Sequence, residues 1–159
     1  MIDIKYTLRN HGWADCEIIS ENAKINISAS YLSDALGGLL SAVVELINGK
    51  REARTQFDEE PGEYRWIFNQ TKENLIDLKI IEFPELRGNK PNEDGKELLK
   101  TECTLKELAT TLFNSADAIL KKFGEDGYKK NWIEHDFPIN QYKFISNWLY
   151  SDNSPLEKS

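Results

Sequence analysis

The sequence predicts an α+β domain in which a mainly antiparallel sheet of six to seven strands packs against two long amphipathic helices. Two stretches, residues 30–49 and 104–124, carry apolar side chains at helical spacing. Short stretches that alternate between apolar and polar residues lie around them, separated by turn residues that favour antiparallel pairing. The expected order is three strands, a helix, three or four strands, a helix and a short C-terminal helix.

The first helix is expected over residues 30–49 and forms the centre of the predicted core. Ser30 is the expected N-cap, and Asn48 with Gly49 suits a left-handed C-terminal cap. Gly37 and Gly38 lie in mid-helix, where glycine is unfavourable, so another internal segment is expected to approach the helix backbone there. The apolar stripe comprises Leu32, Ala35, Leu36, Leu39, Val43, Leu46 and Ile47.

Strands are expected at residues 2–8 and 14–21, around residues 25–27, and at 53–57, 63–71 and 75–83. The stretch 75–83 is apolar on both faces, which is typical of a central strand. Residues 84–95 form the longest expected loop, and 96–103 a seventh strand. The Asp-Glu-Glu-Pro-Gly run at 58–62 predicts a tight turn between two strands.

The second helix is expected to begin at a capping box, in which Thr104 and Glu107 satisfy each other's backbone amides. Lys121 and Lys122 suit its last turn, and Gly124 is expected to end it. Residues 125–138 read as irregular, and residues 139–150 as a short third helix. We expect a single domain over residues 1–150, followed by a polar tail at 151–159.

The chain has 159 residues and a net charge of −7, with 27 acidic residues against 20 basic ones. This balance argues against direct nucleic-acid binding and favours a basic protein partner, although the same charge also keeps a small domain soluble. Cys16 and Cys103 are too few for a disulfide framework and lack zinc-ligand spacing, so both are expected to be buried thiols. The polar N-terminus and the absence of a long apolar run predict no signal peptide, no membrane span and a cytoplasmic location.

No stretch carries a catalytic, phosphate-binding or metal-binding signature, so we expect no enzyme activity, no cofactor and no metal site. The two histidines are His11, beside Gly12, and His135, between Glu134 and Asp136. Either histidine, paired with a carboxylate, can perform acid–base chemistry. The alternative function is therefore a small-molecule-binding or hydrolytic enzyme that uses His11 or His135 in a cleft against the sheet.

Acidic residues gather in three predicted loops, and aromatic residues stand beside them. Such a mixture suits a protein-binding surface, because tyrosine and tryptophan are common binding hot spots. Solvated turns and core packing are the plainer explanations for the same residues. The candidate partner-binding residues are Asp58, Glu59, Glu60, Glu63, Tyr64, Trp66, Glu93, Asp94, Glu125 and Asp126. Further aromatic residues expected to be exposed are Trp13, Tyr128 and Trp132.

Three segments resemble a family of small, uncharacterised bacterial proteins: HGWAD at 11–15, SYLSDALGGLLSAVVELINGK at 30–50 and EPGEYRW at 60–66. No catalytic residue set comes with this resemblance. By general type, the small acidic chain is also similar to immunity proteins of contact-dependent growth inhibition and other polymorphic toxin systems. That second resemblance implies a cytoplasmic protein that binds and neutralises a cognate toxin domain, often a basic nuclease, by occluding its active site.

Overall fold

A computed structural model describes residues 1–85 and 89–151, and it has the predicted α+β class with antiparallel strands. Residues 86–88 of the expected loop and residues 152–159 of the expected tail lie outside the described part. One sheet pairs β1 (Ile2–Leu8), β2 (Trp13–Ser20) and β3 (Lys24–Ser30) in that order. The other pairs β4 (Glu52–Asp58), β5 (Glu63–Lys72), β6 (Leu75–Phe83) and β7 (Lys96–Thr104).

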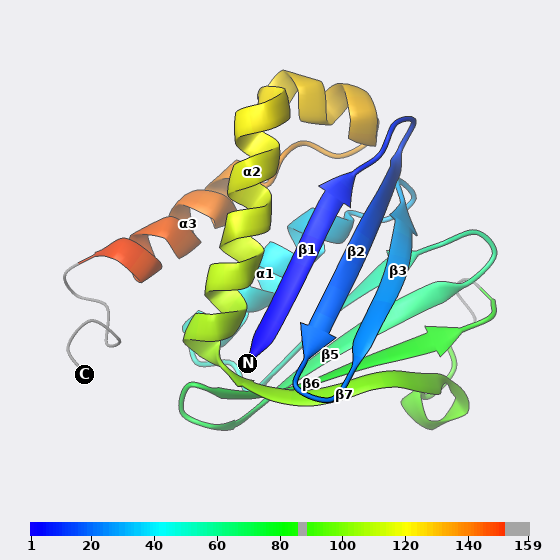
Figure 1. Ribbon diagram of the computed structural model, residues 1–159, viewed down its shortest axis with the longest axis vertical. Coiled ribbons are helices and arrows are strands. Elements are labelled where there is room, and N and C mark those ends of the chain that lie inside the picture. Colours follow the sequence, from blue (N-terminus) through cyan, green and yellow to red (C-terminus); the bar gives the residue numbers. More distant parts are fainter. Residues whose placement is uncertain (86–88, 152–159) are drawn as a thin grey trace.

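The strands therefore form two sheets, whereas the sequence suggested one. Helix α1 (Ala35–Ile47) connects β3 to β4 and packs along β4, so the chain enters the second sheet after the helix without pairing β4 to β3. The expected central strand, β6, lies inside the second sheet between β5 and β7. Figure 1 shows the helices gathered on one side of the molecule, with α2 beside β1.

Helix α1 begins at Ala35, five residues later than expected. Ser30 is not its N-cap, because Ser30 is still paired with Trp13 at the end of β3 and is fully buried. Asp34 caps the helix instead, with its carboxylate accepting a hydrogen bond from the Gly37 amide at 3.2 Å. The expected C-terminal cap is confirmed, since Gly49 adopts a left-handed φ of 93°.

Helix α2 (Leu105–Trp132) begins at the predicted capping box, in which the Glu107 amide donates to Thr104 Oγ1 at 3.1 Å. Gly124, with φ 67° and ψ 175°, interrupts the helical backbone, but the chain turns back into helix up to Trp132. The expectation that residues 125–138 are irregular is thus wrong for 125–132. Tyr128 and Trp132 are fully buried, and their contacts with the core hold this second segment in place. Helix α3 (Ile139–Tyr150) lies where it was expected.

Two hydroxyl groups of α2 occupy the free edge of β1. The amide of Ile4 donates to Thr111 Oγ1 at 2.8 Å, and the amide of Tyr6 donates to Ser115 Oγ at 3.0 Å. The Ser115 hydroxyl in turn donates to the Ile4 carbonyl at 3.0 Å. An edge strand left open invites pairing with another chain, so α2 closes this edge in place of a further strand.

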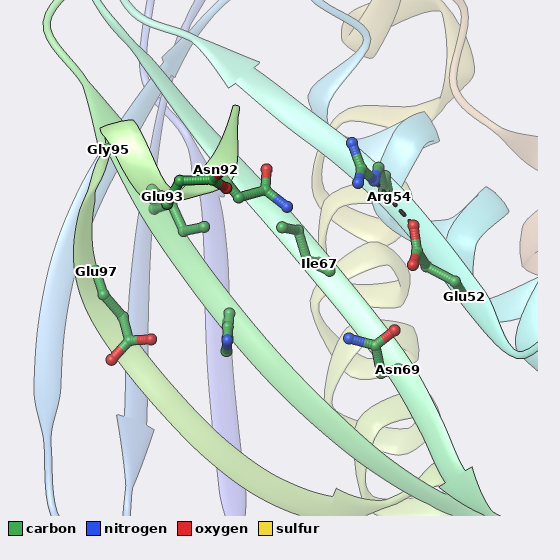
Figure 2. Close-up of a pocket in the computed structure, with 10 residues that line it drawn as sticks. Glu52, Arg54, Ile67, Asn69, Asn92, Glu93, Gly95 and Glu97 are labelled. Atoms are coloured by element: carbon green, nitrogen blue, oxygen red, sulfur yellow. Dashed lines mark hydrogen bonds and ion pairs between the residues drawn. The ribbon is translucent and has the colours of Figure 1, made fainter. Parts of the chain in front are cut away.

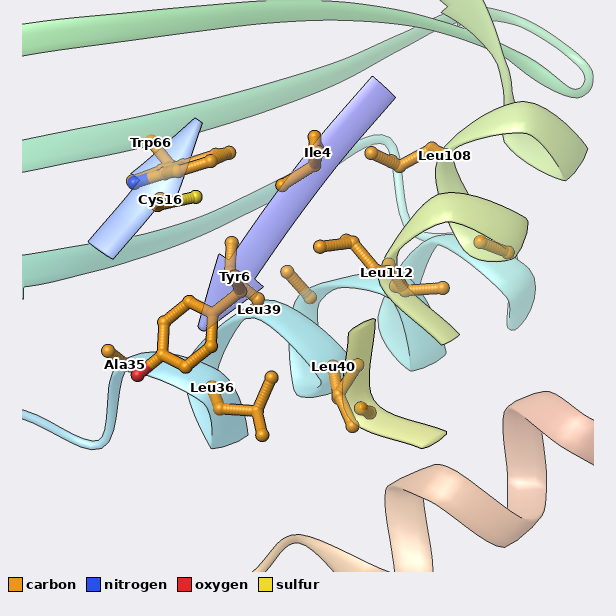
Figure 3. Packing of buried hydrophobic residues seen from close by; sticks show 14 of the residues in the cluster. Ile4, Tyr6, Cys16, Ala35, Leu36, Leu39, Leu40, Trp66, Leu108 and Leu112 are labelled. Carbon is orange, nitrogen blue, oxygen red and sulfur yellow. The ribbon is translucent and has the colours of Figure 1, made fainter. Parts of the chain in front are cut away.

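The inner faces of both sheets and the three helices share one buried cluster. Figure 3 shows part of it, with Leu39 of α1, Leu112 of α2, Tyr6 of β1 and Trp66 of β5. Leu39 and Leu112, the centres of the two predicted apolar stripes, are fully buried. A side chain at Gly38 would collide with Thr55 of β4, which confirms the expected close approach to the α1 backbone.

Candidate protein-binding surface

The β4–β5 hairpin carries the acidic turn, but two of its four predicted carboxylates are not at the surface. Asp58 and Glu63 are only 4% and 3% exposed. The Asp58 amide donates to Ser33 Oγ at 3.0 Å, and its carboxylate accepts from Gln56 Nε2 at 2.7 Å. Glu63 lies 3.8 Å from the Arg65 guanidinium. The side chains of Gln56 and Arg65, each two residues away on the same strand, partner the two buried carboxylates, so neither Asp58 nor Glu63 can be a first point of contact.

The rest of the hairpin tip surrounds a surface hollow of about 540 Å³, named here the hairpin hollow. Its lining residues are Glu59, Pro61, Gly62, Glu63, Tyr64, Glu82, Phe83, Pro84, Asp94 and Lys96. The accessible carboxylates of the lining are those of Glu59, Glu82 and Asp94, and its one ammonium group is that of Lys96. Glu60 is exposed at the adjoining tip, and Tyr64 is half-buried in the wall. The arrangement suits a basic group on a partner, with Tyr64 as an aromatic contact.

Tyr64 lies against the carboxylates of the hairpin hollow. Burial raises the pKa of its hydroxyl, and the neighbouring carboxylates of Glu59 and Glu82 raise that pKa further. Glu82 was missed by the sequence reasoning, although it faces Tyr64 directly in the β5–β6 register. The sequence does contain a signal for Glu82. The short turn between the strands at 63–71 and 75–83 fixes which residues lie opposite each other, and it places Glu82 opposite Tyr64.

Arg65 brings the loop before β7 to the hairpin. Its guanidinium donates to Asn92 Oδ1 at 2.7 Å and to the Lys90 carbonyl at 2.9 Å, and it lies 4.3 Å from the ring centre of Phe83. These contacts position the single 3₁₀ turn η1 (Asn92–Asp94), which places Asp94 in the hairpin hollow. The structure therefore joins two acidic loops that are 30 residues apart in the sequence.

Glu93 turns away from its neighbour Asp94. It lines a different hollow, of about 450 Å³, on the outer face of the four-stranded sheet (Figure 2). In Figure 2, Glu93 and Glu97 lie across the sheet from Glu52 and Arg54, which are joined by a 3.0 Å ion pair. Charges of both signs meet on this face, so Glu93 does not extend the carboxylate cluster of the hairpin hollow.

Glu125 and Asp126 belong to a third hollow, of about 560 Å³, which lies where the ends of three helices meet. We name it the helix-end hollow. Its lining residues are Asp34, Glu125, Asp126, Lys129, Glu134, His135, Asp136, Phe137, Pro138, Ile139, Asn140 and Gln141. It shares no lining residue with the hairpin hollow among those that the structure describes. The predicted acidic surface is thus divided between separate places.

Three of the aromatic residues expected at the surface lie inside. Trp66, Tyr128 and Trp132 are each 0% exposed, so none can contact a partner in this conformation. Trp66 points into the core because its alternation along β5 places it on the inner face with Phe68, and the two rings stack 6.2 Å apart. Trp132 donates from Nε1 to the Ser33 carbonyl at 3.0 Å. Trp13 stays half-buried at the start of β2.

The two histidines lie in different settings. His11 is exposed in the β1–β2 turn with a left-handed φ of 64°. His135 lines the helix-end hollow beside Asp34, so the cleft that holds a histidine lies between helix ends and not against the sheet. The lining residues of that hollow include no serine, threonine or cysteine that could serve as a nucleophile. Elsewhere in residues 1–85 and 89–151, no group of His, Cys, Asp or Glu side chains is placed to hold a metal ion.

Both cysteines are buried and free, as expected. Burial raises the pKa of the Cys103 thiol to about 12, and it raises that of Cys16 as well. Since the thiolate is the reactive form, both groups are packing residues. None of the described helices is long and apolar enough to cross a membrane.

No protein-family model matches the sequence, and no curated protein matches it. Among solved structures, the fold is similar to a chain described as "CdiA-CT/CdiI toxin and immunity complex from Enterobacter cloacae", with a TM-score of 0.47 and 10% sequence identity. The alignment covers 74% of this chain and 98% of that chain. A likeness at this level does not bear on function.

Proposed function

We propose that the protein is a bacterial immunity protein, which binds a cognate toxin domain in the cytoplasm and neutralises it without catalysis of its own. The observation that carries the proposal is the hairpin hollow, where the carboxylates of Glu59, Glu82 and Asp94 surround half-buried Tyr64. The net charge of −7 adds long-range attraction for a basic partner.

A basic nuclease is the toxin class that fits this surface best. Such an enzyme holds the phosphates of its substrate with lysine and arginine, and the same side chains can pair with the carboxylates of the hairpin hollow. Tyr64 supplies an aromatic anchor that excludes water from those pairs. Neutralisation then follows by occlusion, because the basic side chains and the cleft they line are no longer available to nucleic acid.

Coexpression with a toxin domain encoded beside this gene tests the proposal. The expected result is a stoichiometric complex, growth of cells that the toxin alone kills, and loss of nuclease activity in the purified complex. Glu60→Gln combined with Asp94→Asn should weaken the protection, whereas Glu21→Gln combined with Glu73→Gln, two exposed carboxylates in the other turns, should not. Protection without a complex would point to another mechanism and would overturn the proposal.

A further inference from the structure

The strand β7 forms an open margin of the four-stranded sheet. It pairs with β6 on one side, and no described strand pairs with its other side. The opposite margin of the sheet is β4, against which α1 packs, and the edge of β1 is closed by hydroxyl groups of α2. Figure 1 shows β7 along the lower margin of the sheet, where it leads into α2. An open edge presents amides and carbonyls to which another strand can add.

The hydrogen bonds between β6 and β7 indicate which backbone groups of β7 face outward. In an antiparallel pair of strands, directly opposed residues alternate between pairs that share hydrogen bonds and pairs that share none. The Leu105 amide donates to the Asn74 carbonyl at 2.8 Å. The next pair along, Leu75 with Thr104, is therefore one that shares none. The Thr104 amide accordingly faces away from β6, where Glu107 Oε1 accepts from it at 2.9 Å.

The outward-facing amides of Lys100 and Glu102 have no such acceptor. The same alternation directs the amides and carbonyls of both residues away from β6, in step with Thr104. No other described element makes a hydrogen bond to these groups. The register between β6 and β7 shifts at Leu98, so the regular open stretch is short and centres on Thr101.

The side chains of Lys100 and Glu102 face like charges within the sheet. Lys100 lies opposite Lys79 of β6, and Glu102 lies opposite Asp77. Both are pairs without shared hydrogen bonds, in which opposed side chains come closest. Lys100 and Glu102 are exposed, and neither forms an ion pair with another residue of 1–85 or 89–151. Like charges directly opposite each other destabilise a sheet, so an added strand that brings the opposite charges relieves two unfavourable pairs.

The order of charges along the edge selects a second copy of the same strand as the partner. Three antiparallel registers bring the outward backbone groups of residues 100 and 102 in two copies together. The register centred on Lys100 opposes lysine to lysine, and the one centred on Glu102 opposes glutamate to glutamate. The register centred on Thr101 instead opposes Lys100 of each copy to Glu102 of the other and brings the two threonines together. Opposite charges and threonine pairs both stabilise adjacent strands, so this register is the favoured one.

We propose that the free edge of β7 is a self-association surface, through which two copies of the chain pair antiparallel about Thr101. The two four-stranded sheets then join into one continuous sheet with a twofold axis. Because the paired stretch is short, the dimer is weak, with a Kd on the order of 100 μM. The pairing uses the middle of β7, whereas the hairpin hollow uses only Lys96 at its start.

Sedimentation of the full chain over a concentration series tests the proposal, with Lys100→Glu, Glu102→Lys and an equimolar mixture of the two variants. Each variant alone opposes like charges in the Thr101 register, so its self-association should weaken by about tenfold or more. In the mixture every charge meets its opposite, so association should return to at least the wild-type strength. Lys143→Glu, on an exposed residue of α3, is the matched control and should dimerise like the wild type. Its mixture with Glu102→Lys carries the same net charges but should not form the stronger complex.

Amide hydrogen exchange locates the contact within the chain. Protection of the Lys100 and Glu102 amides should rise with wild-type concentration, whereas that of the Thr101 amide, which faces β6, should not change. Both substitutions place opposite charges across β6 and β7, so each variant should be at least as stable as the wild type, and denaturation curves check this.

Three results would overturn the proposal. The first is a monomer at every concentration for both the wild type and the mixture. The second is self-association of Lys100→Glu that equals that of the wild type. The third is a dimer that leaves the exchange of the Lys100 and Glu102 amides unchanged. None of these measurements involves a toxin domain, so the toxin-binding proposal stands or fails separately.

Discussion

Gly38 sets the distance between α1 and β4. Its missing side chain leaves room for Thr55 Oγ1, which lies where a Cβ atom would be. Glycine at position 38 therefore lowers the stability of the helix itself but allows α1 to pack closely against the edge strand β4. Thr55 is β-branched and has few rotamers in a strand, so it cannot easily move aside.

Gly38→Ala should consequently destabilise the protein, although alanine favours a helix by ~1 kcal/mol over glycine. We expect a net loss of about 1–3 kcal/mol in the free energy of unfolding, because the added methyl group overpacks the contact with Thr55. Chemical denaturation measures the loss. Thr55→Ala in the same chain should restore much of it, and an alanine at position 38 that stabilises the protein would show that the contact is not tight.

Whether a residue's structural role can be predicted from the sequence depends on how far away its partners are. The capping box of Thr104 and Glu107 was predictable because its partners are three residues apart. The burial of Asp58 and Glu63 was not predictable, although their carboxylates have partners only two residues away, because it depends on where the hairpin packs, as the bond from the Asp58 amide to Ser33 shows. An acidic turn looks the same in sequence whether its carboxylates are solvated or enclosed.

At the scale of elements, side chains of α2 accept hydrogen bonds from the edge of β1 where a neighbouring strand would otherwise pair. Thr111→Val keeps the shape of the side chain but leaves the buried Ile4 amide without an acceptor. The expected loss of stability is ~1–3 kcal/mol, the cost of an unpaired buried donor. Thr110→Val on the neighbouring position is the matched control and should change stability by less than about 0.5 kcal/mol.

Denaturation curves of the two variants test whether the Thr111 hydroxyl seals the edge of β1. Equal stability of Thr111→Val and Thr110→Val would mean that water or a shifted backbone satisfies Ile4, and that α2 does not seal the edge. A gain of dimer for Thr111→Val, measured by sedimentation, would support the sealing role more directly, because an opened edge is a pairing site.

Most elements were predictable from local patterns, and the errors come from tertiary contacts that those patterns do not show. The start of α1 was placed at Ser30 because serine is a good cap, but Ser30 pairs within β3 and leaves the role to Asp34. The helix beyond Gly124 was missed because glycine usually ends a helix, whereas here burial of Tyr128 and Trp132 draws the chain back into helical form. The division into two sheets depends on the packing of α1 on β4, which no periodicity encodes.

At the scale of the whole molecule, the carboxylates are not spread evenly. Four of them line the hairpin hollow and five line the helix-end hollow, and these two hollows come from different elements. The sequence predicted the residue types but not their grouping, because Asp94 reaches the hairpin through the pairing of β7 with β6 and through the bonds that Arg65 makes to the loop before β7.

The central claim is that the carboxylates of the hairpin hollow, with Glu60 at the adjoining tip, attract and engage a basic toxin domain. Association kinetics of that domain at low and high salt test it most directly, with the wild-type chain, the Glu60→Gln/Asp94→Asn variant and the Glu21→Gln/Glu73→Gln control. Both variants lose two negative charges, so only position distinguishes them. We expect the first variant to lower the on-rate by about three- to tenfold at low salt and to flatten its salt dependence, with the control close to wild type. On-rates and salt slopes that are the same for the two variants would contradict the claim.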